Sequence, residues 1–432
     1  MDYLTRLNYL KSLKKTILKY ELEIKQALFE DLGKSSQESY STEIGIVLLE
    51  LSLFIKKLKK WMKPKRVKSS LIAFPSRSFI YPEPFGKVLI IGPWNYPFQL
   101  ILMPLIGAIA AGNQVVVKPS EFAIETEHII KTIIKEVFTE DVVQVVSGNH
   151  LVSQELLEKQ FDYIFFTGSE KVGKVVMQAA SKHLTPVTLE LGGKSPCIIV
   201  DTKDIQLAAK RTAFGKLINA GQTCIAPDYV LIQEKDKDQF IKYFIEATES
   251  FYGKDPLNTL DYPKIIHQRH HERLKNLMNG QEVIYGGQYS ETKIAPTLLI
   301  PKKDSPIMEE EIFGPILPIL TFKDLSEIPK LVIDKPLALY LFTDNKDVKD
   351  YIITNIQSGG MTINDTLMHF SNHHLGFGGV GKSGMGTYHG KHSFDTFTHY
   401  KPVLFKSKLI DISFKYLPSS KQKESIIKKI LK

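Results

Sequence analysis

The chain has 432 residues, of which 43 % are hydrophobic and 24 % charged, with two cysteines and a formal net charge of +9. This length favours two or three domains, and this composition is typical of a water-soluble globular protein. The apolar runs fall short of the roughly 18 residues that a membrane span needs, and the N-terminus lacks the features of a signal peptide. Two cysteines make no disulfide framework, which indicates a reducing, cytoplasmic location.

Two amphipathic helices are expected first, over residues 2–32 and 36–62. An exposed extended arm follows at 76–86, because Pro82 and Pro84 exclude that stretch from a central strand. Apolar strands then alternate with helices. The strands are expected at 87–92, 114–119, 142–147 and 162–166, and the helices at 98–111, 122–138, 151–159 and 170–182.

The alternation resumes after residue 196. Strands are expected at 197–200 and 229–232, helices at 204–219 and 237–250, and later strands at 297–300, 316–320, 337–342 and 361–364. This pattern predicts an α/β fold built on parallel sheets.

The positive charge is concentrated at the C-terminal end. Residues 401–432 contain nine lysines and two acidic residues, so they carry +7 of the net charge. A solvated basic tail accounts for this charge, and peripheral contact with an anionic membrane surface is the alternative interpretation. No basic patch is interleaved with aromatic residues, so the sequence does not favour nucleic-acid binding.

The stretch GFGGVGKSG (376–384) fits both the P-loop pattern and the dinucleotide fingerprint. A phosphate-binding loop must join a buried strand to the N-terminus of a helix. No β-branched run precedes this stretch, and Gly384, Gly386 and Gly390 fall where the helix would continue, each at a cost of up to about 1 kcal/mol. The match is therefore interpreted as accidental, and no ATP site is predicted.

Cys224 lies in the turn GQTCIAPDY (221–229), where a side chain can be exposed rather than packed. A free thiol is a strong nucleophile even when only a few per cent of it is ionised near neutral pH. Free cysteines are also among the most buried residues, so the turn alone leaves a catalytic and a structural role open. Cys197 begins an apolar strand and is interpreted as a packing residue.

Polar residues at the ends of other strands suggest further chemistry. Glu190 stands between two leucines before paired glycines, a setting that raises a carboxyl pKa and suits a general base; a surface turn is the alternative. Asn95, in PWNYP after strand 87–92, is a candidate donor to an oxyanion. Gly168 and Ser169 join a strand to a helix and form a candidate phosphate cradle. KPSE (118–121) ends its strand with a cation and a carboxylate that suit a ribose.

Together these segments resemble the aldehyde dehydrogenase superfamily, most closely its class 3 branch, the fatty and aromatic aldehyde dehydrogenases. The motifs occur in the family's order along nearly the whole chain, from EDLGKSS near the N-terminus to YHGKHSFDTFTHYK near the C-terminus; between them lie PWNYP, KPSE, FTGS, LELGGKSP, GQTCIAPDY, EEIFGP, SGGMTIND and FGGVGKSGMG. The stretch 376–384 then corresponds to the family's late glycine loop, in which this chain has Gly376 where proline is common.

The resemblance implies a division into domains. Residues 1–67 and 85–191 would form a Rossmann-type NAD-binding domain, and residues 192–393 an α/β catalytic domain. Residues 68–84 and 394–406 would form a small β bridging arm that makes homodimers, and residues 407–432 the basic C-terminal tail.

The resemblance also implies a reaction, the oxidation of aldehydes to carboxylic acids. Cys224 would be the nucleophile that forms a thiohemiacetal and then a thioester. Asn95 and the backbone N–H of Cys224 would form the oxyanion hole. Glu190 would be the general base that activates water to hydrolyse the thioester.

The implied cofactor is NAD, with NADP tolerated. Eight residues are expected to contact it: Lys118 and Glu121 at the adenosine ribose, Gly168 and Ser169 at the pyrophosphate, Glu311 and Phe313 at the nicotinamide ribose and ring, with Trp94 and Val172 completing the set.

Two other functions compete with this one. In a CoA-acylating aldehyde dehydrogenase, CoA replaces water; such enzymes commonly lack the base at the LELGGK position, so the presence of Glu190 favours hydrolysis. In a nucleotide-binding scaffold without turnover, there is no reason to retain Cys224, Glu190 and Asn95 together.

A metal enzyme is a third alternative, and no metal site is expected. His267, His270 and His271 have i, i+3, i+4 spacing, but the stretch HQRHHERLK is polar throughout and is interpreted as a solvated helix face. No role is assigned to His369, His373 and His374.

The expected substrate is a medium- or long-chain aliphatic aldehyde or an aromatic aldehyde. The class 3 branch often has tryptophan where this chain has Phe214, in AFGKLINAGQTC. A smaller ring at that place reshapes the aldehyde tunnel, so the substrate range is expected to differ from that of the branch.

Overall fold

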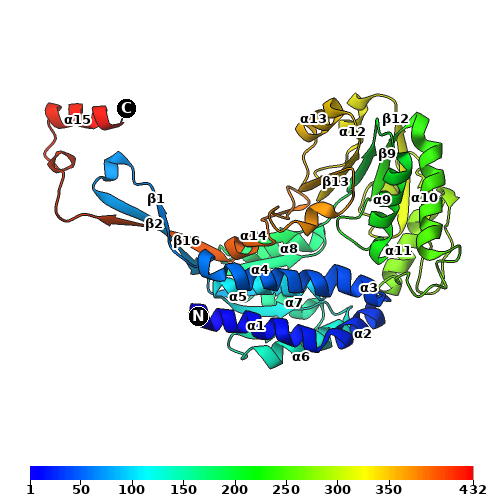
Figure 1. The fold of residues 1–432 in the computed structure, drawn as a ribbon, viewed down its shortest axis with the longest axis horizontal. Helices are drawn as coiled ribbons and strands as arrows, with labels where there is room; N and C mark the ends of the chain where they lie inside the picture. Colours follow the sequence, from blue (N-terminus) through cyan, green and yellow to red (C-terminus); the bar gives the residue numbers. More distant parts are fainter. Residues whose placement is uncertain (432) are drawn as a thin grey trace.

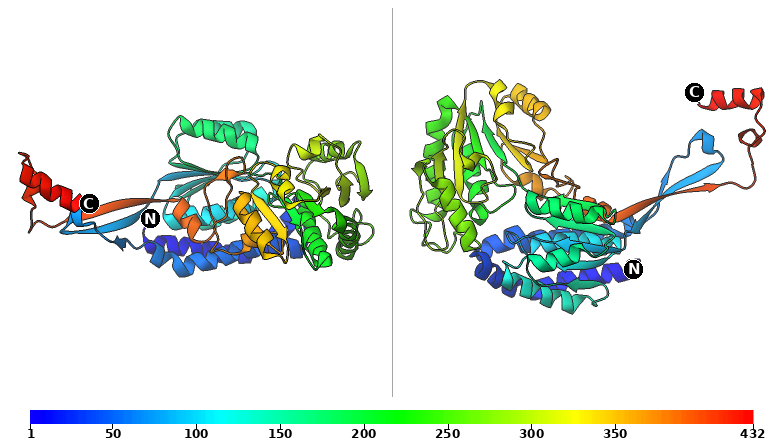
Figure 2. Two further views of the ribbon diagram at one scale, coloured as in Figure 1. Left: turned by 90° about the horizontal axis from the view of Figure 1, so that it is seen from above. Right: turned by 180° about the vertical axis from the view of Figure 1, so that it is seen from behind.

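A computed structural model describes residues 1–431 and contains three β-sheets (Figure 1). A six-stranded and a seven-stranded sheet, each with helices packed on it, form the body of the molecule. A three-stranded arm leaves this body and carries the C-terminal segment at its far end (Figure 1, Figure 2). The predicted α/β fold is confirmed.

The N-terminal helices differ from the two continuous helices predicted. The first is split at Tyr20 into α1 (Tyr3–Lys19) and α2 (Glu21–Leu32), and α2 ends at Gly33, whose φ of 68° is left-handed. The second consists of α3 (Ser36–Ser39), the π-helical turn η1 (Tyr40–Ile44) and α4 (Gly45–Trp61). Single π-helical turns are rare and are frequent at functional sites.

The six-stranded sheet has the order β15-β7-β6-β3-β4-β5, and β15 is its antiparallel strand. Its strands are β3 (Lys87–Ile91), β4 (Gln114–Lys118), β5 (Val143–Val145), β6 (Tyr163–Thr167), β7 (Val187–Glu190) and β15 (Gly384–Met385). One face packs against α1, α4, α5 (Gln99–Ala111) and α6 (Ile124–Val137), and the other against α7 (His150–Leu157) and α8 (Glu170–Ser181). Successive residues of β3 show the alternation, because Val88 and Ile90 pack with the first group and Leu89 and Ile91 with the second.

The seven-stranded sheet has the order β10-β11-β12-β9-β8-β13-β14, and β10 is antiparallel to β11. Its strands are β8 (Pro196–Ile199), β9 (Tyr229–Gln233), β10 (Glu282–Tyr285), β11 (Thr297–Ile300), β12 (Ile316–Phe322), β13 (Ala338–Phe342) and β14 (Gly360–Ile363). Its helices are α9 (Ile205–Leu217), α10 (Lys237–Tyr252), α11 (Gln268–Met278), α12 (Ile328–Leu331) and α13 (Lys346–Asn355). The sequence pattern did not reveal β10, α12 or α13.

The arm consists of β1 (Lys65–Val67), β2 (Ser76–Pro84) and β16 (Thr398–Lys406), in the order β1-β2-β16. The prediction that Pro82 and Pro84 keep this stretch out of a central strand is wrong, since β2 is the middle strand. The prolines are tolerated because β1 pairs only with Ser78–Ile80 of β2, so that the proline end of β2 is bonded on one side.

The chain reaches the arm through α14 (Lys391–Thr396) and leaves it toward the C-terminal helix α15 (Lys421–Leu431). Figure 1 shows α15 beside the tip of the arm, away from both large sheets. Among residues 1–431, no helix is both long and apolar enough to cross a membrane.

Candidate active site

A cleft of about 490 Å³ lies between the two large sheets and is lined from both. From the six-stranded sheet it takes residues that follow β3, β6 and β7, at the carboxyl ends where parallel sheets bind ligands. Eight predicted residues line it: Trp94, Asn95, Gly168, Ser169, Glu190, Cys224, Glu311 and Phe313. Three predicted cofactor residues lie outside its lining: Lys118, Glu121 and Val172.

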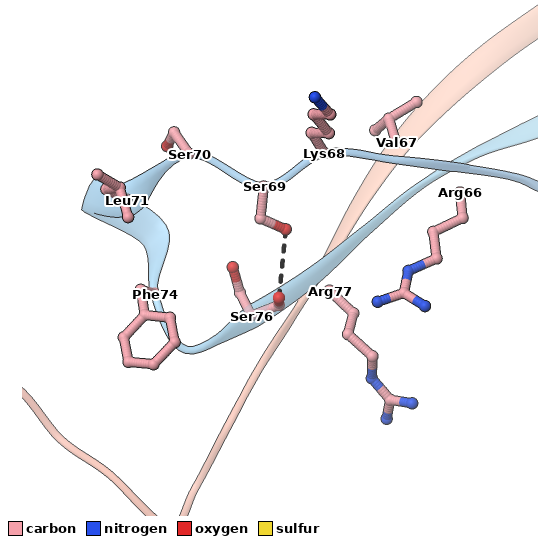
Figure 3. Close-up of a pocket in the computed structure, with 9 residues that line it drawn as sticks. All are labelled: Arg66, Val67, Lys68, Ser69, Ser70, Leu71, Phe74, Ser76 and Arg77. Carbon is pink, nitrogen blue, oxygen red and sulfur yellow. Dashed lines mark hydrogen bonds between the residues drawn. The ribbon is translucent and has the colours of Figure 1, made fainter.

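A second hollow of about 500 Å³ lies at the tip of the arm, between β1 and β2 (Figure 3). There Ser69 Oγ donates a hydrogen bond to the carbonyl of Ser76 at 3.2 Å, beside Leu71 and Phe74. None of the predicted catalytic or cofactor residues lines this hollow, so the chemistry belongs to the cleft between the sheets.

Cys224 follows a strained turn and lies on the wall of the cleft. Helix α9 ends in the 3₁₀ turn η3 (Ile218–Gly221), in which Asn219 and Ala220 have φ values of 51° and 50°. Left-handed backbone is uncommon for residues other than glycine and often marks a functional site. Gly221 follows with φ 72°, where a Cβ would lie 2.2 Å from the carbonyl oxygen of Gly314. The position of Cys224 on the cleft wall favours the catalytic over the packing interpretation.

The other cysteine has a different environment. Cys197 is fully buried in β8, and its sulfur lies 3.3 Å from the hydroxyl of Thr212. Burial raises the pKa of its thiol to about 12. Only Cys224 of the two thiols reaches the cleft.

Asn95 is fixed through both its side chain and its backbone. It is 3 % exposed, and its side-chain amide donates to the carbonyl of Gln222 at 3.0 Å. Its own carbonyl accepts hydrogen bonds from Lys34 Nζ at 2.9 Å and from Asn219 Nδ2 at 2.8 Å. A primary amide has two N–H groups, so one remains for a ligand in the cleft.

Glu190 ends β7 and is 2 % exposed, so the alternative of a surface turn is wrong. Within residues 1–431, neither of its carboxyl oxygens has a hydrogen-bond partner. Burial raises its pKa well above the usual value, and burial likewise raises the pKa of Cys224, with Glu311 and Glu190 adding to the shift. A buried carboxyl without a partner costs free energy, so its position in the cleft makes Glu190 a candidate functional residue.

The glycine loop supports the strand that carries Glu190. Gly384 in β15 is paired with Glu190, and the N–H of Leu191 donates to the carbonyl of Ser383 at 3.1 Å. A Cβ on Gly384 would lie 2.1 Å from the carbonyl oxygen of Leu189, so glycine permits this close pairing. The loop leads into β15 and opens no helix, which agrees with the interpretation that its P-loop pattern is accidental.

The cleft fits a dinucleotide at its α8 end. Gly168 and Ser169 lead from β6 into α8, and Ser169 caps the helix by accepting the N–H of Val172 at 3.4 Å. The free N–H groups of a helix N-terminus favour an anionic group such as a pyrophosphate. Lys118, buried at the end of β4, lies 3.2 Å from the partly exposed Glu121, and neither residue lines the cleft.

At the other end, aromatic rings and a carboxyl fit the nicotinamide riboside. The rings of Trp94 and Phe313 meet edge to face with centroids 5.3 Å apart, and Phe313 has a left-handed φ of 55°. A Cβ on Gly192 would lie 2.0 Å from Glu311 Oε2, so glycine leaves the room that the carboxyl occupies. Burial raises the pKa of Glu311 to about 8.

Sequence reasoning missed His270, which also lines the cleft. The prediction of a solvated face for HQRHHERLK is wrong, since His270 and His271 are 8 % and 3 % exposed. The ring of His270 lies 2.8 Å from the carbonyl of Phe313, and burial, aided by Arg273, lowers its pKa to about 3. The spacing of His270 and Leu274 on the buried face of α11 was the signal that could have revealed this.

These features fit an oxidoreductase that uses a covalent thiol intermediate, with a candidate dinucleotide site at one sheet and a candidate nucleophile at the other. Residues 1–403 match the aldehyde dehydrogenase family, and the chain belongs to this family. It therefore oxidises aldehydes and depends on NAD(P). The predicted class of enzyme and its NAD(P) cofactor are confirmed.

Several relatives agree with the class 3 branch. The chain is 48 % identical to 4,4'-diaponeurosporen-aldehyde dehydrogenase of Staphylococcus aureus, covering all of this chain and 95 % of the relative. It is 46 % identical to aldehyde dehydrogenase family 3 member A2 of Macaca fascicularis, covering 93 % of this chain and 84 % of the relative. The solved substrate-bound state of Staphylococcus aureus AldH superposes with a TM-score of 0.97 at 48 % identity, covering 100 % of this chain and 95 % of that one.

Proposed function

We propose that this aldehyde dehydrogenase works through three residues of the cleft, with Cys224 as nucleophile, Asn95 as oxyanion donor and Glu190 as general base. The observation that carries the proposal is their convergence on one cleft, where the carboxyl of Glu190 has no partner among residues 1–431. The division of the chain into an NAD-binding domain, a catalytic domain, a bridging arm and a tail is part of the same proposal.

The residues divide the reaction between them. The Cys224 thiolate sulfur bonds to the aldehyde carbon, and the carbonyl electron pair moves to an oxygen held by the Asn95 amide and the Cys224 N–H. NAD(P) held in the cleft would supply the hydride acceptor needed to bring this carbon to the oxidation level of an acid. Glu190 then takes a proton from water, the water oxygen attacks the acyl carbon, and the Cys224 thiolate leaves as the acid is released.

The cofactor would be held within the cleft by Trp94, Gly168, Ser169, Glu311 and Phe313. Its adenosine end would be held by Lys118, Glu121 and Val172.

Product analysis distinguishes hydrolysis of the thioester from acyl transfer to CoA. Formation of the free acid with NADH in the absence of CoA supports hydrolysis, whereas NADH formation that requires CoA would contradict the role of Glu190.

The proposed substrates are medium- or long-chain aliphatic and aromatic aldehydes. Phe214, on α9, is half-exposed, and a substrate range that differs from that of relatives with tryptophan at this place is part of the proposal. A series of aldehydes of increasing chain length, followed by NADH formation, measures this range.

We also propose a cytoplasmic homodimer formed through the arm, whose strand β16 exposes Leu404 and Phe405. A relative from Canis lupus familiaris is named a dimeric, NADP-preferring aldehyde dehydrogenase.

NAD is expected to be preferred to NADP. Glu121 can accept a hydrogen bond from a ribose 2′-OH, whereas it repels a 2′-phosphate, and Lys118 at 3.2 Å offsets that repulsion in part. A hydrogen bond to a charged group contributes about 1.5–3 kcal/mol, so Glu121→Gln should reduce the preference for NAD about tenfold. The ratio of kcat/KM for the two cofactors measures this. A higher kcat/KM with NADP in the unchanged enzyme would show that the role of Glu121 is wrong.

The C-terminal helix is expected to bind anionic membrane surfaces through charge. Helix α15 exposes Ile426 and Ile430 beside Lys421, Lys428 and Lys429. Each lysine near an anionic surface contributes about 1 kcal/mol. The protein should therefore sediment with anionic vesicles at low salt and be released at high salt, and Lys428→Glu with Lys429→Glu should weaken this binding. Binding that persists at high salt would contradict a purely electrostatic contact.

A further inference from the structure

A buried ion pair lies beneath the active-site loop without touching the cleft. Lys34 follows α2, Glu43 lies in the π-helical turn η1, and Lys34 Nζ is 2.5 Å from Glu43 Oε1. Both side chains are 0 % exposed, and neither lines the cleft. We infer that this pair is a positioning device that sets the location of the oxyanion donor Asn95. The inference rests on the role proposed for Asn95.

Glu43 holds the chain on the far side of the loop PWNYP. Its second oxygen, Oε2, accepts the backbone N–H groups of Phe98 at 2.9 Å and Gln99 at 3.0 Å. These are N–H groups at the start of α5, which have no partner within the helix. From the π-helical turn η1, the carboxyl of Glu43 contacts both this helix end and Lys34. The carboxylate therefore fixes where α5 begins, four residues after Asn95.

Lys34 holds the loop itself. Its ammonium donates to the backbone carbonyl of Asn95 at 2.9 Å and lies 4.0 Å from the ring centroid of Tyr96. The hydroxyl of Tyr96 lies 2.6 Å from that of Thr223, the residue before Cys224. The Lys34 ammonium thus contacts both Asn95 and Tyr96. Tyr96 is in turn hydrogen-bonded to the segment that carries Cys224.

The strained turn η3 also contacts the loop that carries Asn95. Asn219 Nδ2 also donates to the carbonyl of Asn95, at 2.8 Å, so both lone pairs of that oxygen are in use. The backbone N–H of Asn219 in turn donates to Glu38 in α3, at 2.8 Å. The N-terminal segment therefore fixes the loop that carries Asn95 and, through Glu38, the turn that precedes Cys224.

The Lys34–Glu43 pair is expected to affect the reaction rate as well as the stability of the fold. A donor stabilises an oxyanion well only when it is held in place before the charge develops. Misplacement by about 1 Å can cost on the order of 100-fold in rate. Lys34 and Glu43 do not line the cleft, and the side chain that links them to it most directly is that of Asn95, so we expect their effect on catalysis to pass through Asn95.

The test is a double-mutant cycle on the rate of the NADH burst, measured by rapid mixing of the holoenzyme with aldehyde. Lys34→Met should slow the burst about tenfold in the wild-type background and less than about twofold in the Asn95→Ala background. The affinity for NAD, measured by fluorescence, should not change in either. The neutral pair Lys34→Gln with Glu43→Gln should give the same pattern without leaving one buried charge unpaired.

Glu50→Gln is the matched control. Glu50 is a carboxyl of α4, 4 % exposed, that accepts the N–H of Gly390 at 2.8 Å, away from the cleft. Its substitution should lower the melting temperature and leave the burst rate the same within twofold in both backgrounds. Equal slowing by Lys34→Met in both backgrounds, or no slowing by either Lys34 variant, would overturn the inference. If Asn95→Ala alone left the burst unchanged, the proposed role of Asn95 would fail instead.

Discussion

Glu190→Gln is expected to release about one equivalent of NADH per active site and then stall as a thioester. Glutamine keeps the size of the side chain but cannot take a proton from water. Loss of a general base costs about 100- to 10,000-fold, so the slow phase should fall by that factor. Mass spectrometry should find the acyl group on the peptide that contains Cys224, and Cys224→Ser should give neither burst nor adduct.

The environment of Glu190 gives this prediction a pH dependence. Burial raises the pKa of its carboxyl, so the proton is retained to a higher pH than in water. Only the ionised form is a base. The turnover of the wild-type enzyme after the NADH burst should therefore speed up as the pH rises. The same phase in Glu190→Gln should lose that dependence. Normal steady turnover in the variant would remove Glu190 from the mechanism, and a missing burst would mean that it also deprotonates the thiol.

The parts of the fold that the sequence predicted are those with local signals. The apolar strands β3, β4 and β6 are short runs bounded by turn residues, and they were found within one or two residues. Asn95, Gly168 and Glu190 each follow or end such a strand, and the carboxyl ends of parallel strands meet at one edge. The position of these residues on one cleft could therefore be expected, although their burial could not.

What escaped prediction depends on contacts between distant segments. Lys34 and Asn95 are 61 residues apart, and no local pattern shows that the ammonium of one lies under the carbonyl of the other. The π-helical turn has the sequence of an ordinary amphipathic helix, and its residue Glu43 bonds to the start of α5, which lies 55 residues further along the chain. His270 was misread because its stretch is polar, whereas polar rings can be buried when a carbonyl such as that of Phe313 accepts their N–H.

The arm shows the same limit for strands. Strand β2 was expected to be extended and exposed, and it is extended, but its partners β1 and β16 lie on either side of it in the sheet. Strand β16 is more than 300 residues away in the chain, with Thr398 paired to Pro84. The expectation that proline is excluded from a central strand assumes that both neighbouring strands pair along its whole length. It fails here because β1 pairs with β2 only as far as Ile80 and does not reach the prolines.

Asn95→Ala is expected to lower the rate of the NADH burst by about 100- to 1000-fold, the cost of removing one oxyanion donor. The donor acts on the charge that develops in the transition state, so KM for the aldehyde should change much less than kcat. The substitution also removes the hydrogen bond to Gln222, which should cost some stability. A rapid-mixing assay with saturating aldehyde and NAD measures the first effect, and thermal unfolding measures the second.

Asn113→Ala separates the two effects, since Asn113 is also a buried amide of the six-stranded unit. Its Nδ2 donates to the carbonyls of Ala108 at 3.1 Å and Phe397 at 2.9 Å, and it does not line the cleft. This variant should lose at least as much stability as Asn95→Ala, because three side-chain hydrogen bonds are lost, the third from the Gly86 N–H to Asn113 Oδ1 at 2.9 Å. Its burst rate should stay within about twofold of the wild type. If both variants lost stability and neither slowed the burst, Asn95 would be a structural residue, and the oxyanion would have to be stabilised by the backbone N–H of Cys224 alone.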